Sequence, residues 1–164
     1  MYDRVVDVPR LICTVDPRER PVDDPVRLIH ASLEAALGLQ FGVVGLNYYR
    51  SGADSVAWHR DRIGRSGTPV TVALVSLGSP RTLAVRPHTD HPSRTSSTTS
   101  TSPVSAHRWA LGHGDLLVMS GACQRDWEHC VPKERCVGPR ISLAFRCKEA
   151  IKGPRIDRAG VPPL

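Results

Sequence analysis

The amino-acid sequence lacks the features that would place the protein in a membrane or send it out of the cell. Its 164 residues contain no run of 18 apolar residues, which a transmembrane helix requires. The N-terminus is charged at Asp3, Arg4, Asp7 and Arg10, where a signal peptide needs an apolar stretch. We therefore expect a cytoplasmic protein without membrane association.

Cysteine pairs are also missing. The five cysteines form an odd set with no C-x-x-C pair, which argues against a disulfide framework and against a cysteine-rich zinc site. A chain of this length buries roughly two thirds of its unfolded surface, so its core needs neither kind of support. We expect one compact domain and a monomer.

Only one segment has the pattern of a helix, residues 24–38. Asp24 suits the N-cap, Pro25 suits the first turn, and Gly38 suits the left-handed residue that ends many helices. The apolar side chains recur at helical spacing, at Val26, Ile29, Leu33 and Leu37. We expect this helix to pack one apolar face against the rest of the domain.

After the helix, short apolar or alternating runs are separated by glycine and proline, which is typical of antiparallel sandwiches and barrels. The expected strands are residues 42–49, 55–59, 70–77, 82–85, 115–119 and 140–146. The predicted fold is mostly β, in the α+β class, with two facing sheets and one flanking N-terminal helix. The Ser- and Thr-rich residues 93–105 are expected to form a mobile loop, and residues 150–164 a flexible tail.

The first candidate for chemistry is a pair of side chains at the end of an expected strand. His59 and Asp61 are two residues apart, so they point to the same face. A later strand can add a third ligand, and His129 is the best candidate. Two histidines and one carboxylate leave open positions on a metal, as in non-haem Fe(II) oxygenases, although zinc hydrolases use the same residue types. A solvated His–Asp hydrogen bond is the simpler alternative.

The second candidate is the expected strand 140–146. Arg140 and Arg146 fall on one face of this strand, with Ser142 and Ala144 between them. The apolar side chains in between point to the opposite face. A buried arginine is costly without an anionic partner. A dicarboxylate held by Arg140 would provide one. Salt bridges to acidic loops on a solvated face are the alternative.

Together these motifs resemble the AlkB family of Fe(II)- and 2-oxoglutarate-dependent dioxygenases, from about Phe41 to Cys147. The pieces that match, in order, are Asn47-Tyr48-Tyr49, His59-Arg60-Asp61, Val75-Ser76-Leu77-Gly78 with Arg81, Leu111 to Leu116, His129, and Arg140 to Arg146. The order, the spacing and the terminal R-x5-R pattern make the resemblance specific.

The resemblance implies a double-stranded β-helix, or jelly roll, over residues 41–149, and it implies roles for eight side chains. The Fe(II) ligands would be His59, Asp61 and His129. The 2-oxoglutarate site would include Asn47, Tyr49, Arg140, Ser142 and Arg146. Arg140 would pair with the far carboxylate of the cosubstrate and so join the ligands as a catalytic residue, and Arg146 would lie near the metal.

The reaction implied is oxidative dealkylation of alkylated bases in DNA, with RNA left open, which consumes O2 and releases an aldehyde, succinate and CO2. Two alternatives remain: a 2-oxoglutarate-dependent hydroxylase of a protein or small molecule, and a nucleic-acid-binding pseudoenzyme. Ile63 stands where repair members often carry an acidic residue that recognises the damaged base. The chain therefore departs from the family in how it would recognise its substrate.

Charge and length give two further expectations. Lys and Arg number 22 and Asp and Glu number 16, a surplus of six that suits a polyanionic partner. We expect a phosphate-facing rim built from Arg60, Arg62, Arg65, Arg81 and Arg86. Residues 1–40 are fewer than the family usually spends on its nucleotide-recognition lid, so we expect a partial lid region and the helix there.

Overall fold

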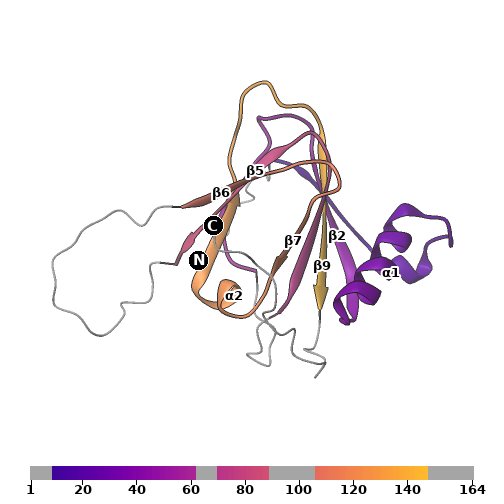
Figure 1. The fold of residues 1–164 in the computed structure, drawn as a ribbon. Helices are drawn as coiled ribbons and strands as arrows, with labels where there is room; N and C mark the ends of the chain where they lie inside the picture. Colours follow the sequence, from indigo (N-terminus) through magenta and orange to yellow (C-terminus); the bar gives the residue numbers. More distant parts are fainter. Residues whose placement is uncertain (1–8, 62–69, 89–105, 148–164) are drawn as a thin grey trace, which may run out of the picture.

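The computed structural model describes residues 9–61, 70–88 and 106–147, which form two β-sheets and a flanking helix (Figure 1). The expected 93–105 loop, the 150–164 tail and Ile63 lie outside these residues. Within them, none of the helices has both the length and the apolar character needed to cross a bilayer.

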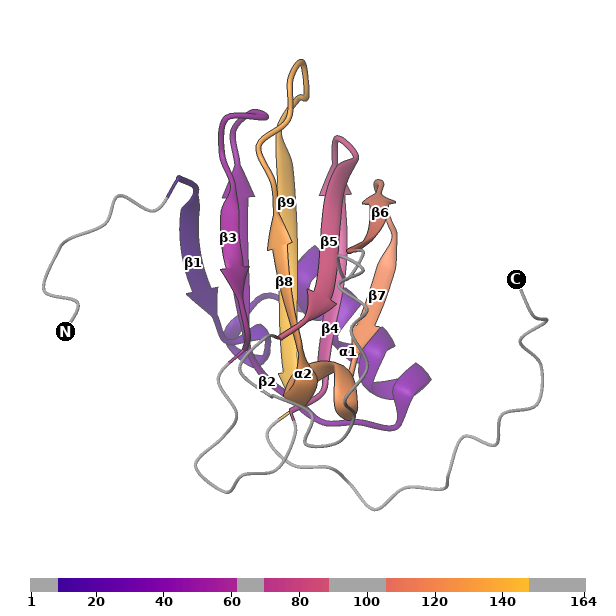
Figure 2. The same ribbon diagram turned by 90° about the vertical axis from the view of Figure 1, so that its left-hand side faces the viewer.

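The larger sheet, which we call sheet A, has five strands and the smaller, sheet B, has four (Figure 2). Sheet A is ordered β1 (Leu11–Val15), β2 (Phe41–Tyr49), β9 (Arg140–Cys147), β4 (Val72–Gly78) and β7 (Leu116–Met119). Sheet B is ordered β3 (Val56–His59), β8 (Trp127–Val131), β5 (Arg81–Pro87) and β6 (His107–Leu111). Neighbouring strands pair antiparallel throughout. The predicted mostly β jelly roll is confirmed.

The helix α1 spans Pro25–Leu37, as its capping residues predict. The Asp24 carboxylate accepts a hydrogen bond from the Val26 N–H at 2.9 Å. Gly38 ends the helix in the left-handed conformation, with φ of 62°, and its N–H donates to the Glu34 carbonyl. The helix lies on the side of sheet A that faces away from sheet B (Figure 1).

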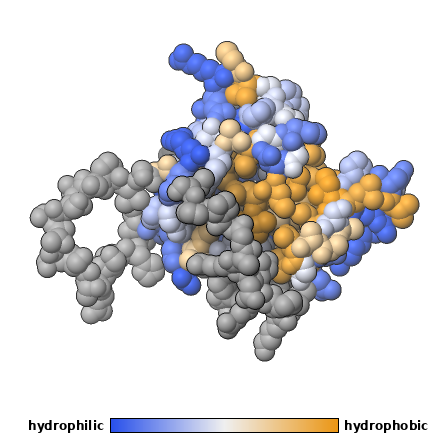
Figure 3. Space-filling view, viewed as in Figure 1, coloured by the Kyte–Doolittle hydropathy of each residue, from blue (hydrophilic) through white to orange (hydrophobic). Residues whose placement is uncertain are grey.

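Two apolar clusters form the core, one on each side of sheet A. The cluster between sheet A and α1 contains Leu33, Val44, Val75, Leu143 and Phe145. The cluster between the two sheets includes Leu74, Leu83, Val85 and Ala144. Strand β9 therefore sends alternate side chains to the helix and to the interior, as its sequence predicts. The apolar side chains of β7 on the helix side, Leu116 and Val118, remain 45% and 40% exposed, and Figure 3 shows hydrophobic surface on this side of the molecule.

Three strands and two short helices were not expected from the sequence. Strands β1 and β6 are edge strands with mostly exposed side chains, so no alternation of apolar and polar residues marks them. Strand β8 buries the polar residues Glu128 and His129, so its sequence lacks the alternation of apolar and polar residues that predicts a strand. The 3-10 helix Pro17–Glu19 and helix α2 (Ala122–Asp126) are too short to give a period. Strand β1 pairs with β2, so this part of the N-terminal 40 residues is continuous with sheet A.

Candidate active site

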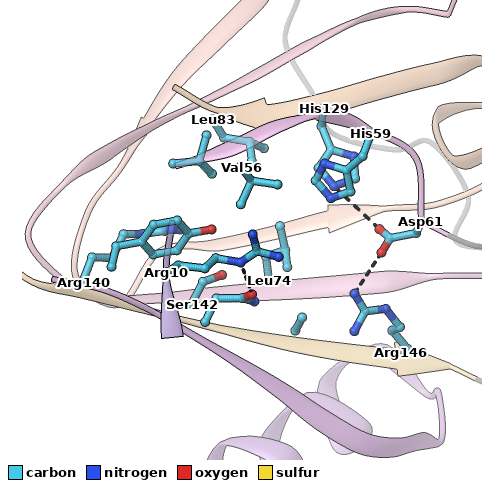
Figure 4. Close-up of a pocket in the computed structure, with 14 residues that line it drawn as sticks. Arg10, Val56, His59, Asp61, Leu74, Leu83, His129, Arg140, Ser142 and Arg146 are labelled. Atoms are coloured by element: carbon cyan, nitrogen blue, oxygen red, sulfur yellow. Dashed lines mark hydrogen bonds and ion pairs between the residues drawn. The ribbon is translucent and has the colours of Figure 1, made fainter. Parts of the chain in front are cut away.

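A narrow cavity of about 80 Å³ lies between the two sheets, and all eight predicted site residues line it (Figure 4). Strand β9 provides Arg140, Ser142 and Arg146, while β2 provides Asn47 and Tyr49. The histidines and Asp61 come from β3, the residues after it, and β8. The lining residues that the sequence did not single out are Arg10, Val56, Leu74, Leu83, Val131 and Ala144.

One end of the cavity holds the predicted metal ligands. His59 and His129 are paired residues on neighbouring strands, and their ring centroids are 4.3 Å apart. The Asp61 Oδ2 atom lies 3.8 Å from His129 Nε2. Figure 4 shows the three side chains facing one another. The structure thus brings together two imidazoles and a carboxylate from two separate segments of the sequence.

The surroundings of both histidines suit metal ligation. The Nδ1 atom of His59 lies 2.8 Å from the Ala57 carbonyl, which can only accept, so Nδ1 carries a proton and Nε2 is the nitrogen left to face a cation. Burial, followed by the nearby His59, lowers the pKa of His129 to about 4. His129 therefore does not need to lose a proton before it can bind a cation near neutral pH.

The Asp61 carboxylate is held by an arginine. Arg146 Nη2 donates to Asp61 Oδ1 at 2.9 Å, and the Asp61 side chain is only 9% exposed. In the part of the chain that the structure describes, no three His, Cys, Asp or Glu side chains already enclose a space for a metal ion. The donor types and their proximity fit Fe(II), while Arg146 sets the present direction of the carboxylate.

The opposite end of the cavity is closed and cationic. Arg140 is 2% exposed, and its Nε donates to Ser76 Oγ at 2.8 Å. Its Nη1 is fully buried and has no hydrogen-bond partner among the described residues. A buried guanidinium nitrogen without a partner is costly, so the geometry asks for an anion at this end. Burial also lowers the pKa of Arg140 from its usual value.

Tyr49 lines this closed end and is 2% exposed. Its ring centroid lies 5.3 Å from the Arg140 Cζ atom. Burial raises the pKa of Tyr49, and the Arg140 charge opposes that rise. The phenol therefore stays protonated at neutral pH and can donate its hydrogen to a bound anion.

Two polar residues that sequence reasoning missed also hold the site. Arg10 Nε donates to Asn47 Oδ1 at 2.8 Å, which places a further cation on the cavity wall beside Arg140 and Arg146. Ser76 accepts from Arg140 and donates to the Leu111 carbonyl at 3.3 Å. Ser76 could have been noticed in the sequence, because it is a polar residue inside the apolar run of β4. Arg10 could not, because it precedes the edge strand β1, which the sequence did not predict.

The expected five-arginine rim is wrong at Arg81, which is 1% exposed and lies inside the molecule. Arg86 pairs with Glu128 and lies over the Trp58 ring at 4.2 Å from its centroid. Arg60 contacts the Arg125 carbonyl at 3.5 Å. Arg62 and Arg65 fall outside the described residues. The error has a plain cause, because the charge of a residue does not show on which face of a strand it lies.

Comparison with known proteins places these features in context. A family model described as the 2OG-Fe(II) oxygenase superfamily matches residues 14–146. The chain is 35% identical over 138 residues to human alpha-ketoglutarate-dependent dioxygenase alkB homolog 3, covering 84% of this chain and 46% of that protein. It is 34% identical over 130 residues to DNA oxidative demethylase ALKBH2 of Arabidopsis thaliana, covering 73% of this chain and 41% of that protein. The chain thus spans less than half the length of these two relatives.

Solved structures share the fold at low sequence identity. The structure of OsALKBH1 has a TM-score of 0.50 at 16% identity and covers 74% of this chain and 62% of that chain. A prolyl-4-hydroxylase from Pseudomonas putida has a TM-score of 0.50 at 17% identity and covers 86% of this chain and 73% of that chain. These two structures support the architecture and nothing finer.

Proposed function

Because this chain belongs to the 2OG-Fe(II) oxygenase superfamily, we propose that it is a dioxygenase that oxidatively removes alkyl groups from bases in nucleic acid, DNA first and RNA second. Membership of this family implies a requirement for Fe(II), 2-oxoglutarate and O2. The similarity to alkB homolog 3 and to a DNA oxidative demethylase supports the reaction. Its products are the repaired base, an aldehyde, succinate and CO2.

The observation that carries the proposal is that one cavity has a cationic end and, opposite it, an end suited to a metal ion. Arg140 offers an unpartnered buried nitrogen at the closed end, and two imidazoles and a carboxylate converge at the other. A dicarboxylate that is also a metal chelator satisfies both ends at once. 2-Oxoglutarate is such a molecule.

The residues fit the cosubstrate in specific ways. Arg140 would hold its far carboxylate, with Tyr49 as a hydroxyl donor and Ser142 on the adjacent wall. Leu74 and Leu83 line the cavity between the ends, and their side chains keep water away from the chain of the bound acid. His59, Asp61 and His129 would hold Fe(II), which together with 2-oxoglutarate and O2 supplies the oxidant that hydroxylates the carbon on the base nitrogen.

The open end is where a base would enter. His59 is exposed, whereas His129 behind it is 9% exposed, so a substrate reaches the site from the His59 side. A base in a duplex must leave the stack to reach such a site. We propose alkylated nucleic acid as the partner of a cytoplasmic monomer. The hydroxylase of a protein or small molecule is not favoured, since the named relatives at 34–35% identity are AlkB homologues.

The test is to incubate the iron-loaded protein with 2-oxoglutarate and oligonucleotides that carry methyl or etheno lesions. We expect loss of the lesion with matching formation of succinate, and no loss on the same oligonucleotides with the His129→Ala protein. An unmodified oligonucleotide serves as the substrate control. Succinate formation without repair of any lesion would replace nucleic acid with another substrate, and no 2-oxoglutarate turnover at all would contradict the reaction itself.

A further inference from the structure

Arg81 is a fully buried cation to which the proposed function gives no role. It begins β5 in sheet B, and its side chain is 0% exposed. Its Nη1 donates to the Ser51 carbonyl at 2.9 Å, and its Nη2 donates to the Asp54 and Pro132 carbonyls, each at 2.8 Å. One guanidinium group thus joins two separate loops to a strand.

The two loops it joins are packed against each other without spare room. The Glu134 N–H donates to the Gly52 carbonyl at 2.9 Å. A Cβ atom at Gly52 would lie 1.9 Å from the Glu134 carbonyl oxygen, so only glycine fits there. Asp54 in turn accepts two side-chain hydrogen bonds from Arg50, at 2.8 and 2.9 Å. We call these two loops, which Arg81 joins, the cap.

The cap reaches the cavity through Tyr49. The Arg81 Cζ atom lies 5.4 Å from the Tyr49 ring centroid, and the Arg140 Cζ atom lies 5.3 Å from the same centroid. Two buried guanidinium groups therefore contact one aromatic ring, which attracts both through its electron-rich face. A shift of Arg81 would release the ring and, with it, one of the contacts that hold Arg140.

The two arginines differ in how their charges are balanced. Arg81 Nε lies 3.1 Å from Glu134 Oε2, whereas Arg140 forms no ion pair among the described residues. The Glu134 Oε1 atom also accepts the Thr82 N–H at 3.0 Å, which keeps the carboxylate beside Arg81. The charge of Arg81 is thus balanced by an ion pair, although its Nε makes no hydrogen bond, whereas Arg140 remains the cation that an incoming anion can pair with.

We propose that Arg81 is a positioning residue that acts through Tyr49 to keep Arg140 aimed at the far carboxylate of 2-oxoglutarate. This inference rests on the proposed function. It predicts that Arg81 sets how well the site distinguishes 2-oxoglutarate from 2-oxobutanoate, a keto acid with the same metal-binding end and no far carboxylate. A purely structural residue would affect the binding of both acids alike.

The experiment measures binding of each acid by calorimetry to the protein loaded with Mn(II), which cannot turn over, for wild type, Arg81→Met and Arg81→Lys. We expect the preference of wild type for 2-oxoglutarate to fall at least roughly tenfold in Arg81→Met, with 2-oxobutanoate affinity within about twofold of wild type. Arg81→Lys keeps the charge but cannot reach three carbonyls, so an intermediate loss is expected. In turnover, KM for 2-oxoglutarate should rise while kcat changes little.

Arg50→Met is the matched control, because it breaks the Arg50–Asp54 pair of the same cap, and Arg50 does not line the cavity. We expect its preference between the two acids to equal that of wild type. An Arg81→Met protein that keeps the wild-type preference would overturn the inference. If Arg81→Met does not fold, a wild-type preference in Arg81→Lys does the same. A wild-type protein that shows no preference for 2-oxoglutarate would instead contradict the proposed function.

The route through Tyr49 can be separated from a direct field effect. If Arg81 acts through the ring, Tyr49→Leu and Arg81→Lys remove the same support, and the loss of preference in the double variant should be close to that of the larger single variant. Additive losses would show that Arg81 acts on the anion without Tyr49, which would overturn that part of the inference.

Discussion

Both ends of the cavity contain arginine side chains, but the two ends differ in how exposed their side chains are. At the closed end Arg81, Arg140, Ser76 and Tyr49 are each no more than 2% exposed and are packed against loops or strands. At the open end the Arg146 side chain is 47% exposed and His59 is exposed as well. The difference separates two tasks, since binding a small dianion tightly needs a dry preformed end, and admitting a large substrate needs an accessible one.

The largest effect is expected when the open end loses a ligand. Asp61→Ala should reduce succinate formation to background, because one of three donors is gone. The closed end is intact in this variant, so it should still bind 2-oxoglutarate with measurable affinity. His107→Ala, which removes an exposed imidazole outside the cavity, is the control and should keep wild-type turnover. Unchanged turnover in Asp61→Ala would remove this carboxylate from the metal site.

The next largest effect is expected at the closed end. Arg140→Met should raise KM for 2-oxoglutarate by roughly 10- to 100-fold, in line with the ~1.5–3 kcal/mol of a charged hydrogen bond. Steady-state kinetics at varied 2-oxoglutarate measure this, with Arg27→Met on α1, outside the cavity, as the control. Since the metal end is untouched, iron affinity should stay within about twofold. A KM equal to that of wild type would place the cosubstrate elsewhere.

A smaller effect is expected from the arginine at the open end. Arg146→Met frees the Asp61 carboxylate that Arg146 now holds at 2.9 Å. Groups that orient a metal ligand are worth roughly 10- to 100-fold in metal affinity, and we expect the low end of that range because Arg146 is half exposed. Iron titration of the metal-free protein measures it. Equal iron affinity in the variant would mean that the Arg146–Asp61 pair has no part in metal binding.

The smallest effect is a difference in pH dependence between the two ends of the metal-free protein. The pKa of His129 falls from its usual 6.5 to about 4, so folding releases a proton and the open end loses stability as pH falls from 6.5 towards 4. Hydrogen bonds from Arg50 lower the pKa of Asp54 in the cap to about 2, so its contribution is present above pH 3.8 and is lost only as pH falls through 2.

Denaturant unfolding at a series of pH values tests this difference. His129→Asn should flatten the fall in unfolding free energy between pH 6.5 and 4, and Asp54→Asn should leave that window unchanged. If Asp54→Asn alters the slope between pH 6.5 and 4, the two ends do not titrate separately.

The sequence predicts the two ends to different degrees. On β9 the period of two is unbroken, so Arg140, Ser142 and Arg146 could be assigned to one face without knowing the fold. His129 could be proposed as the best third ligand but not assigned to a strand face, because β8 buries polar side chains and shows no strand pattern. The local sequence therefore predicts the two faces of a strand where apolar and polar residues alternate. It does not predict them where a polar functional residue is buried.

Arg81 shows the opposite failure. In the sequence it is a charged residue directly before an expected strand, and its burial depends on carbonyl groups from Ser51, Asp54 and Pro132, which are 27 to 51 residues away. Its acidic partner Glu134 is also far along the chain, so no residue near Arg81 in the sequence signals these contacts. Arg10 is similar, since its partner Asn47 lies 37 residues further along the chain.

Strand β9 sets the distance between the two anchoring arginines. Arg140 and Arg146 are six residues apart on one strand, which corresponds to roughly 20 Å between their backbones at the rise of an extended chain. Strand β9 is hydrogen-bonded to β2 on one side and β4 on the other, so inserting or deleting a residue would break two ladders at once. The distance between the two ends of the cavity is thus fixed by backbone hydrogen bonds along both edges of β9.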